Sequence, residues 1–279
     1  MSKVNFESFQ QKKNQNISNP ELSICIRVYN EVNFLPQLIH TLQKQTLQNF
    51  ELNILDSGSN DGTEAYILEN VDCNLYTIDK QEFKFGETCN LLAEISTSPY
   101  ICFLSGHVDL PQNDALETVL NYLANNGVDI GYFRQVPNYY VGCSPYDEVF
   151  LNFKYPGYKG VEIQKGVDSA FSNAGSMFKK TLWSNKKFPD VVASEDYLWV
   201  KDFDRVAYFS DVVLMHSHSE TFEQITKRVN LNKVALIGFK RSYLKFFIKY
   251  MQIFLLLSLK VKNIKTSHKY AMSHAKGYL

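Results

Sequence analysis

Short apolar runs alternate with amphipathic stretches along the first hundred residues of the chain. Residues 22–28 are apolar and β-branched, as is typical of a buried strand, and residues 34–45 follow with a helical pattern. The same order recurs, with strands predicted at 50–55, 75–78 and 100–104 and helices at 64–70 and 88–95. Regular alternation of strand and helix favours an α/β fold with a mostly parallel sheet flanked by helices.

The pattern is less regular in the second half of the chain. Prolines and glycines are frequent over residues 128–175, where we expect long loops that cover a site. Ordered segments are predicted at 171–180 and 191–200, the second of them helical after Ser194. From Glu223 a helical pattern continues to about Lys260.

The composition is that of a globular protein. Hydrophobic residues make up 45% of the 279 residues and charged residues 21%, which excludes a disordered chain and a polytopic membrane protein. The five cysteines are odd in number and form no CxxC pair, so neither a zinc site nor a complete disulfide framework is predicted. A reducing cytoplasm is the simplest compartment. Residues 1–20 are polar, lack the features of a signal peptide, and are expected to be a loose tail.

Charge is distributed unevenly along the chain. From Lys227 onward there are twelve Lys and Arg and no Asp or Glu, so the preceding residues carry a net charge of −12. The basic residues Lys240, Arg241, Lys245 and Lys249 lie among aromatic and apolar residues that continue to Leu259. The apolar run is shorter than the roughly 20 residues that span a bilayer, so we expect contact with the surface of an anionic membrane.

A core or dimer helix with a solvated basic face is the alternative for this basic end. No nucleic-acid partner is expected, because no recognition motif accompanies the charge and the rest of the chain is acidic. The expected location is therefore cytoplasmic, with peripheral attachment at the inner face of the membrane as an option.

Three polar clusters follow predicted strands, at residues 29–31, 56–63 and 105–109. In open parallel sheets ligands bind at the carboxyl ends of the strands, so one cleft could collect all three clusters.

Five motifs occur in a fixed order: VYNE at 28–31, DSGSNDGT at 56–63, LSGH at 104–107, FSNA at 171–174 and SEDYLW at 194–199. Together they resemble family 2 glycosyltransferases, which are inverting enzymes of the Rossmann-like GT-A fold. The likeness is greatest to the rhamnosyltransferase-like branch of bacterial surface-polysaccharide synthesis, which has a Phe-x-[Tyr/Phe]-Gly segment like FKFG at 83–86. The resemblance covers roughly residues 20–230.

The resemblance implies a domain organisation and a reaction. We expect a GT-A domain over residues 21–225 after the polar tail, and a basic amphipathic helical extension over 226–279. The donor would be a nucleotide sugar linked to dTDP or UDP, such as dTDP-rhamnose. The acceptor would be a glycan or a lipid-linked sugar in capsule, O-antigen or similar synthesis.

Donor binding is the role that the resemblance implies for Glu31, Asp56, Ser57, Asp61, Lys84 and His107. A carboxylate can accept a hydrogen bond from a pyrimidine N3–H or from ribose hydroxyls, which suits Glu31 and Asp56. Asp61 would support the same loop. The alternative is that the 56–58 segment is only a turn with Asx capping.

His107-Val108-Asp109 occupies the place of the family's Asp-x-Asp metal motif. Asp109 is a candidate ligand for Mg²⁺ or Mn²⁺, and His216 and His218 are further candidates, since a late histidine often completes the metal shell in this fold. Two alternatives stay open at this motif: His107 could donate to a phosphate, with weak metal dependence, and Asp109 could be a loop residue. For the two late histidines the alternative is an ordinary surface pair.

Glu195-Asp196 resembles the family's acidic pair, in which the Asp is the general base that deprotonates the acceptor hydroxyl. The alternative is that both acids stabilise a helix N-terminus capped by Ser194. Two other functions are weighed against a transferase. A sugar nucleotidyltransferase would need a Gly-rich basic loop after its first strand, which residues 28–31 lack, and a non-catalytic scaffold at the membrane would explain the altered metal motif.

Overall fold

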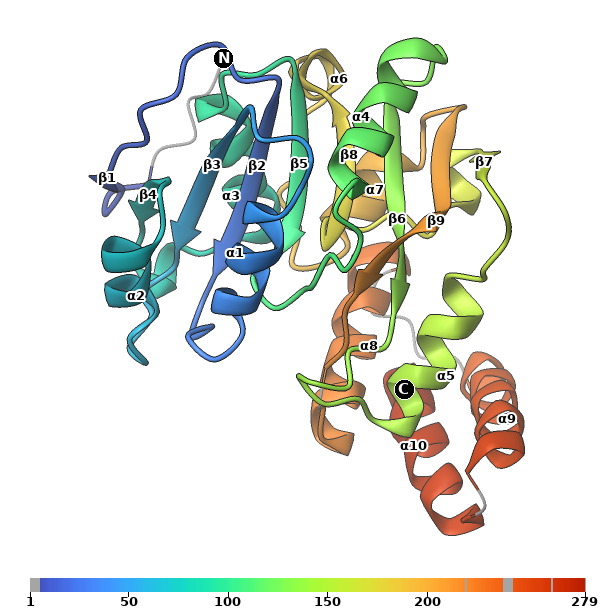
Figure 1. Ribbon diagram of the computed structural model, residues 1–279. Coiled ribbons are helices and arrows are strands. Elements are labelled where there is room, and N and C mark those ends of the chain that lie inside the picture. The colour runs from blue at the N-terminus through green and yellow to red at the C-terminus, as the bar shows by residue number, and fades with distance from the viewer. Residues whose placement is uncertain (1–5, 219, 238–242, 262, 279) are drawn as a thin grey trace.

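The computed structural model describes residues 6–218, 220–237, 243–261 and 263–278. These residues form a nine-stranded sheet with the order β1-β4-β3-β2-β5-β8-β6-β9-β7, and a helical bundle lies at one end of it (Figure 1). The strands are β1 Gln10–Lys13, β2 Leu22–Val28, β3 Phe50–Asp56, β4 Asn74–Thr77, β5 Tyr100–Ser105, β6 Ile130–Val136, β7 Val161–Gln164, β8 Gly175–Lys179 and β9 Val206–Met215.

The predicted α/β sheet flanked by helices is confirmed, but its pairing is mixed, with four parallel and four antiparallel strand pairs among the described residues. β2 pairs in parallel with β3 and β5, and β3 pairs in parallel with β4. β8 runs antiparallel between β5 and β6, and β6 pairs in parallel with β9. β2, β3, β5, β6 and β9 therefore all end at the same edge of the sheet.

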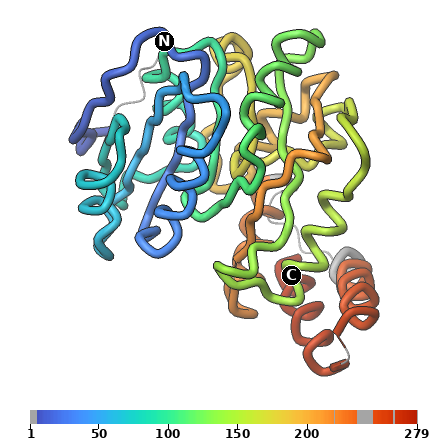
Figure 2. Tube along the Cα trace, viewed as in Figure 1, coloured from blue at the N-terminus to red at the C-terminus, as the bar shows by residue number. Residues whose placement is uncertain are grey.

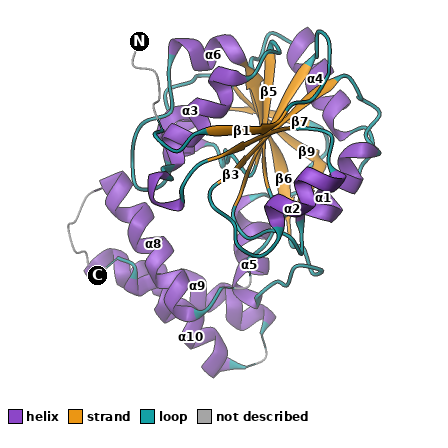
Figure 3. Cartoon of the chain, turned by 90° about the vertical axis from the view of Figure 1, so that its left-hand side faces the viewer, coloured by secondary structure: helices purple, strands orange, loops and turns teal. Residues whose placement is uncertain are grey.

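Helices cover both faces of the sheet (Figure 3). One face carries α1 Leu35–Gln43, α2 Thr63–Asn70 and α4 Ala115–Asn125, and the other carries α3 Phe85–Ile95, α6 Lys180–Asn185 and the short α7 Glu195–Val200. Successive side chains of a strand point to opposite faces, so Ile24 and Ile26 of β2 join one core while Cys25 joins the other. Burial of both faces explains why these strands are almost continuously apolar.

Part of the segment expected to be a loose tail is ordered. β1 pairs antiparallel with β4 at the edge of the sheet, and the side chain of Phe6 is buried. An edge strand leaves much of its length in contact with solvent, which explains why this segment is so polar.

The expectation of long loops over residues 128–175 is wrong for much of that segment. It contains the interior strand β6, helix α5 Pro145–Lys154 and strand β7. Tyr132 and Phe133 of β6 are both buried, one in each of the two cores. The prolines and glycines that suggested loops lie mostly between these elements.

Helices α8 Phe222–Ile237, α9 Tyr243–Lys260 and α10 Ile264–Lys276 form the bundle with α5 (Figures 1 and 2). They share a small core of their own, made by Tyr146, Ile225, Val229, Ile253, Leu257 and Ala271. The helical pattern predicted from Glu223 to Lys260 is thus divided between α8 and α9, and α10 lies within the helical extension expected over residues 226–279. Two residues of the predicted basic stretch, Lys240 and Arg241, lie in the segment 238–242, which is outside the described residues. The domain boundary near residue 225 stays a prediction. Among the helices that the structure describes, none combines the length and apolar character needed to cross a membrane.

Candidate active site

A cleft of about 890 Å³ opens at the carboxyl ends of β2 and β5 and is bounded by residues of α7 and α8. Seven of the predicted site residues line it: Glu31, Ser57, His107, Glu195, Asp196, His216 and His218. Asp56, Asp61, Lys84 and Asp109 do not line it. The structure therefore brings residues from all five sequence motifs into the lining of one cavity.

Asp56 ends β3 directly behind the wall of the cleft. Its Oδ1 accepts hydrogen bonds from the backbone N–H of Ser59 at 3.0 Å and from the Ser59 hydroxyl at 2.7 Å. Its Oδ2 is buried and has no partner within the described part of the chain. Burial raises the pKa of Asp56, and the hydrogen bonds from Ser59 act against that rise. A buried acceptor atom without a partner is unusual and suits a carboxylate that receives a donor from a ligand.

Asp61 holds the loop that follows β3 against the loop that follows β2. Its Oδ1 accepts from the backbone N–H of Thr63 at 3.0 Å, and its Oδ2 accepts from the backbone N–H of Val32 at 3.2 Å. Asn30 adds a second link, because its Oδ1 accepts from the backbone N–H of Asn60 at 2.9 Å. Asn30 adopts a φ of 59°, a left-handed conformation that asparagine tolerates better than most residues. These contacts fix the two loops relative to each other.

Lys84 is exposed and forms ion pairs with Glu87 and Asp190, each at 3.2 Å, outside the cleft. The nearby Lys80 does line the cleft, and its Nζ lies 3.4 Å from the centroid of the Tyr29 ring. Neither Lys80 nor Tyr29 was singled out from the sequence, although Tyr29 belongs to the first motif. The glycine of the FKFG segment has a packing role, since a Cβ on Gly86 would lie 2.1 Å from the carbonyl oxygen of Pro189.

Three histidines from two strand ends meet in the cleft. His107 follows β5, and His216 and His218 follow β9. Their ligand nitrogens all lie within 4.8 Å of one another, and Nε2 of His107 is 3.1 Å from Nε2 of His216. Burial lowers the pKa of His216 well below its ordinary value, and the neighbouring His218 and His107 lower it further. His216 is therefore a neutral imidazole, the form that binds metals.

The Asp109 side chain is not part of this histidine group. Its backbone pairs with that of Met215 through hydrogen bonds of 3.0 and 2.9 Å, and its side chain is buried. Oδ2 accepts from Nε2 of Gln37 at 3.3 Å. Asp109 thus faces α1 and links β5 to the end of β9.

The acidic pair lies at the start of α7. Glu195 is buried, 3.7 Å from Nη2 of Arg27 and 3.5 Å from the side-chain nitrogen of Asn173. Burial and the adjacent Asp196 raise the pKa of Glu195, against the influence of Arg27. Asp196 is half-buried and lines the cleft, and its Oδ2 accepts from the backbone N–H of Asn173 at 3.4 Å.

The Ser194 side chain makes no capping hydrogen bond to α7. Its hydroxyl instead donates to Oδ1 of Asn232 in α8 at 3.3 Å. Ser194 thus occupies the expected N-cap position, with a left-handed φ of 61°, but does not cap the helix through its side chain.

Basic side chains from the bundle also line the cleft, namely Lys154 of α5 and Lys227 and Arg228 of α8. Nη2 of Arg228 pairs with Oε2 of Glu220 at 2.6 Å. From the sequence, the basic end is expected to face a membrane or to be the solvated face of a core or dimer helix. Two of its basic residues, Lys227 and Arg228, instead line the active-site cleft.

The fold and the cleft define a GT-A enzyme, and comparison with known proteins agrees. The family model described as "Glycosyl transferase family 2" matches residues 23–182, so the chain belongs to this family and is a glycosyltransferase. It uses a nucleotide-sugar donor and a glycan acceptor, and neither the nucleotidyltransferase nor the scaffold alternative is favoured.

Among individual relatives, the chain is similar to the O-antigen chain rhamnosyltransferase RfbN of Salmonella typhimurium, with 25% identity over 214 residues, covering 72% of this chain and 68% of the relative. It is also 25% identical over 202 residues to the GalNAc(5)-diNAcBac-PP-undecaprenol beta-1,3-glucosyltransferase of Campylobacter jejuni, covering 68% of this chain and 62% of that one. The chain thus spans about two thirds of the length of these relatives.

The fold is similar to that of the mannosyltransferase PcManGT from Pyrobaculum calidifontis, solved in complex with GDP-Man and Mn²⁺. The TM-score is 0.56 at 15% identity, covering 95% of this chain and 76% of that one. At this identity the likeness concerns the fold alone.

Proposed function

We propose that this glycosyltransferase moves a sugar, with inversion, from a dTDP- or UDP-linked donor to a growing or lipid-linked glycan of a bacterial surface polysaccharide. The observation that carries the proposal is the shared cleft. The same cavity is lined by Asp196, by the three histidines and by residues of the nucleotide-binding motifs. The names of the Salmonella and Campylobacter relatives support a surface glycan as the product.

The nucleoside would bind between the loops that follow β2 and β3. Tyr29 offers an aromatic face, Lys80 a positive charge, and Ser57 a hydroxyl at the cleft wall. Asp56 lies behind this wall, and its unpartnered Oδ2 would receive a base or ribose N–H or O–H once the side chains of the wall move aside on donor binding. The hydrogen bonds made by Asp61 would keep the loop rigid, so that little conformational entropy is lost when the donor binds.

Asp196 would act as the general base. Inverting transfer is a single displacement, in which the acceptor hydroxyl attacks the anomeric carbon as the bond to the diphosphate breaks. Asp196 would take the proton of that hydroxyl, a contribution of about 10²–10⁴ in rate for a well-placed base. Glu195 would hold α7 in position through Arg27 and Asn173, which directs Asp196 into the cleft.

The leaving diphosphate needs positive charge around it. Lys154, Lys227 and Arg228 at the mouth of the cleft would attract and orient it. His107, His216 and His218 would hold a divalent cation, expected from the sequence to be Mg²⁺ or Mn²⁺. When bound, such an ion neutralises charge that develops on the leaving group.

The test is a panel of nucleotide sugars screened by thermal shift, followed by transfer assays with the donors that bind. We expect a dTDP- or UDP-linked sugar to raise the melting temperature and to be consumed with an acceptor glycan. A protein that binds no nucleoside diphosphate, with or without Mn²⁺, would overturn the proposal.

An anionic membrane surface is the proposed location of the acceptor. Leu255 and Leu259 lie four residues apart on α9 and are exposed, Leu259 to 89%. Side chains at this spacing share one helix face. An exposed apolar face beside lysines suits insertion into the headgroup region of anionic lipid.

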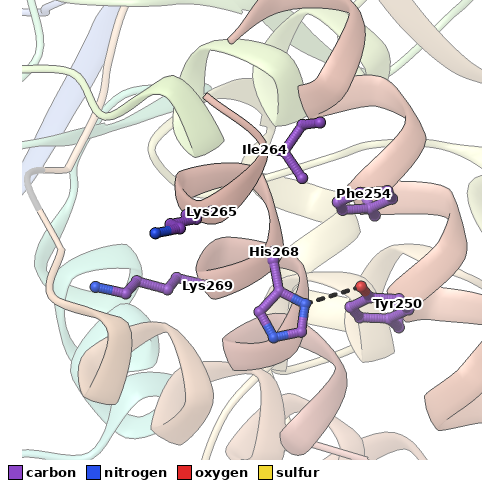
Figure 4. A pocket seen from close by; sticks show the side chains of 6 residues that line it. All are labelled: Tyr250, Phe254, Ile264, Lys265, His268 and Lys269. Atoms are coloured by element: carbon purple, nitrogen blue, oxygen red, sulfur yellow. Dashed lines mark hydrogen bonds between the residues drawn. The ribbon is translucent and has the colours of Figure 1, made fainter. Parts of the chain in front are cut away.

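A groove lies between α9 and α10 in the same bundle. It has a volume of about 460 Å³ and is lined by Tyr250, Phe254, Ile264, Lys265, His268 and Lys269 (Figure 4). The Lys265 and Lys269 side chains extend from α10 in the same direction, and Tyr250 and Phe254 stack against each other at 5.6 Å. This mixture of aromatic and cationic groups suits a boundary between acyl chains and phosphate headgroups.

A further inference from the structure

The hydrogen bonds of His107 and His216 determine which ring nitrogen of each is free. Nδ1 of His107 lies 2.8 Å from Oε1 of Glu31, and Nδ1 of His216 lies 2.9 Å from Oε1 of Gln135. Carboxylate and amide oxygens only accept hydrogen bonds, so Nδ1 carries the proton in both rings. Both Nε2 atoms then present a lone pair.

These two lone pairs face each other. The Nε2 atoms of His107 and His216 are 3.1 Å apart, and the ring of His218 is within 4.9 Å of His107 and 4.7 Å of His216, centroid to centroid. Two acceptors at this distance repel each other unless a cation lies near both. A metal ion bound by the imidazoles removes the repulsion, and so does a single proton shared by the two nitrogens.

The surrounding contacts match those of a metal ligand set. Metal-binding histidines almost always donate their other N–H to a carboxylate or carbonyl oxygen, which orients the ring and raises its basicity. Glu31 does this for His107 and Gln135 does it for His216. Neither contact is needed for an ordinary pair of surface histidines, and His216 is buried.

The donor set also selects among metals. Among the described residues, the metal-ligating side chains that converge here are three imidazoles, and Asp109 is turned toward Gln37. Mg²⁺ prefers oxygen ligands, whereas imidazole suits the later transition metals. Three protein ligands leave a coordination position open, as in catalytic metal sites.

We propose that His107, His216 and His218 form a three-imidazole centre that selects a transition-metal ion such as Zn²⁺, Co²⁺ or Ni²⁺ over Mg²⁺. Glu31 and Gln135 are its positioning residues. Glu31 therefore acts through His107 and does not bind the nucleoside. The metal centre itself is inferred from the contacts among the three histidines, Glu31 and Gln135. Only the role of the bound ion in sugar transfer rests on the proposed function.

The test is metal binding by the full chain after treatment with a chelator. Co²⁺ is titrated while the visible absorption of the ion is followed, Zn²⁺ is then added in competition, and Mg²⁺ is titrated separately by calorimetry. We expect one Co²⁺ per chain, displaced by Zn²⁺, with an affinity at least about 100-fold above that of Mg²⁺. His218→Ala should weaken Co²⁺ binding at least 10-fold, and because His218 is exposed the variant should fold normally. His268→Ala, in the groove between α9 and α10, is the matched control and should bind Co²⁺ as the wild type does.

The role of Glu31 has its own measurement. Glu31→Ala should weaken Co²⁺ binding by about 10- to 100-fold, the usual effect of losing such a contact. Glu31→Gln should recover much of the affinity, because its amide oxygen can still accept from Nδ1. Wild-type Co²⁺ affinity in Glu31→Ala would remove Glu31 from the centre.

Mg²⁺ binding as tight as Co²⁺ binding, unchanged Co²⁺ affinity in His218→Ala, or no Co²⁺ binding at all would overturn the centre. An enzyme that transfers sugar but binds no transition metal would overturn this inference alone. A protein that binds Co²⁺ through the histidines yet uses no nucleotide sugar would overturn only the proposed function.

Discussion

The guanidinium of Arg27, near the end of β2, lies 3.7 Å from the carboxylate of Glu195 at the start of α7. The same guanidinium donates from Nη1 to the carbonyl oxygen of Phe85 at 2.9 Å. Arg27 thus joins the nucleotide-binding half of the sheet, the FKFG segment and the helix that carries Asp196.

Replacement of Arg27 by Met should destabilise the fold and reduce transfer. It would leave the buried Glu195 without its cationic partner, and removal of one member of a buried pair costs about 3 kcal/mol or more. Urea denaturation would measure the loss. Asp202→Ala is the matched control, because it removes an exposed partner of Lys186 and should change the unfolding midpoint little. Equal midpoints for wild type and Arg27→Met would show that this pair does not anchor α7.

The bundle contains a buried histidine that should make stability depend on pH. His274 of α10 is hydrogen-bonded to the hydroxyl of Tyr146 at 2.6 Å, and burial, with smaller contributions from Lys249 and Arg228, lowers the pKa of His274 to about 4. The unfolded chain takes up a proton at this residue below about pH 6.5. The folded chain does not until about pH 4. Stability should therefore fall as the pH drops from about 6.5 to 4, by up to about 3 kcal/mol.

Measurement of the unfolding free energy across this pH range would test that dependence. His274→Gln, which has no titrating ring, should lose less stability on acidification than the wild type. His40→Gln, at an exposed position of α1, provides the control. The same pH slope in wild type and His274→Gln would assign the acid sensitivity to other groups.

The exposed face of α9 should determine membrane binding. Leu255→Glu combined with Leu259→Glu places two negative charges where contact with anionic lipid is proposed, and should weaken binding to phosphatidylglycerol-containing vesicles at least 10-fold. Wild-type binding should also decrease with added salt. Co-sedimentation measures both effects, and Leu68→Glu, at an exposed leucine of α2, should bind as the wild type does. Unchanged binding in the double variant would place the membrane contact elsewhere or remove it.

Much of the fold could be predicted from the sequence because its first strands are buried on both faces. The apolar runs of β2, β3 and β5 and the polar residues that follow them indicated a parallel sheet and the position of its binding edge. β6 was missed because it lies between prolines and glycines, and its pairing with β8 and β9 joins residues that are far apart along the chain.

The candidate site was predicted less completely, because motif order does not indicate the direction of a side chain. Lys84 and Asp109 stand at motif positions yet face away from the cleft, whereas Lys80 lines it. The contacts of Glu31 with His107 and of Gln135 with His216 join separate strand ends, so no spacing in the sequence could show them. For the basic residues of α8, the sequence shows only their positive charge. Charge alone cannot distinguish a residue at a membrane surface from one that lines a cleft.

The central claim is that Asp196 deprotonates the acceptor within this cleft, and Asp196→Asn tests it most directly. The variant should lose at least about 100-fold in transfer rate while its affinity for the nucleotide-sugar donor stays within about twofold of the wild type. Asp190→Asn is the matched control, because Asp190 pairs with Lys84 outside the cleft and should retain full activity. An Asp196→Asn enzyme that keeps most of its transfer activity at unchanged donor affinity would contradict the account.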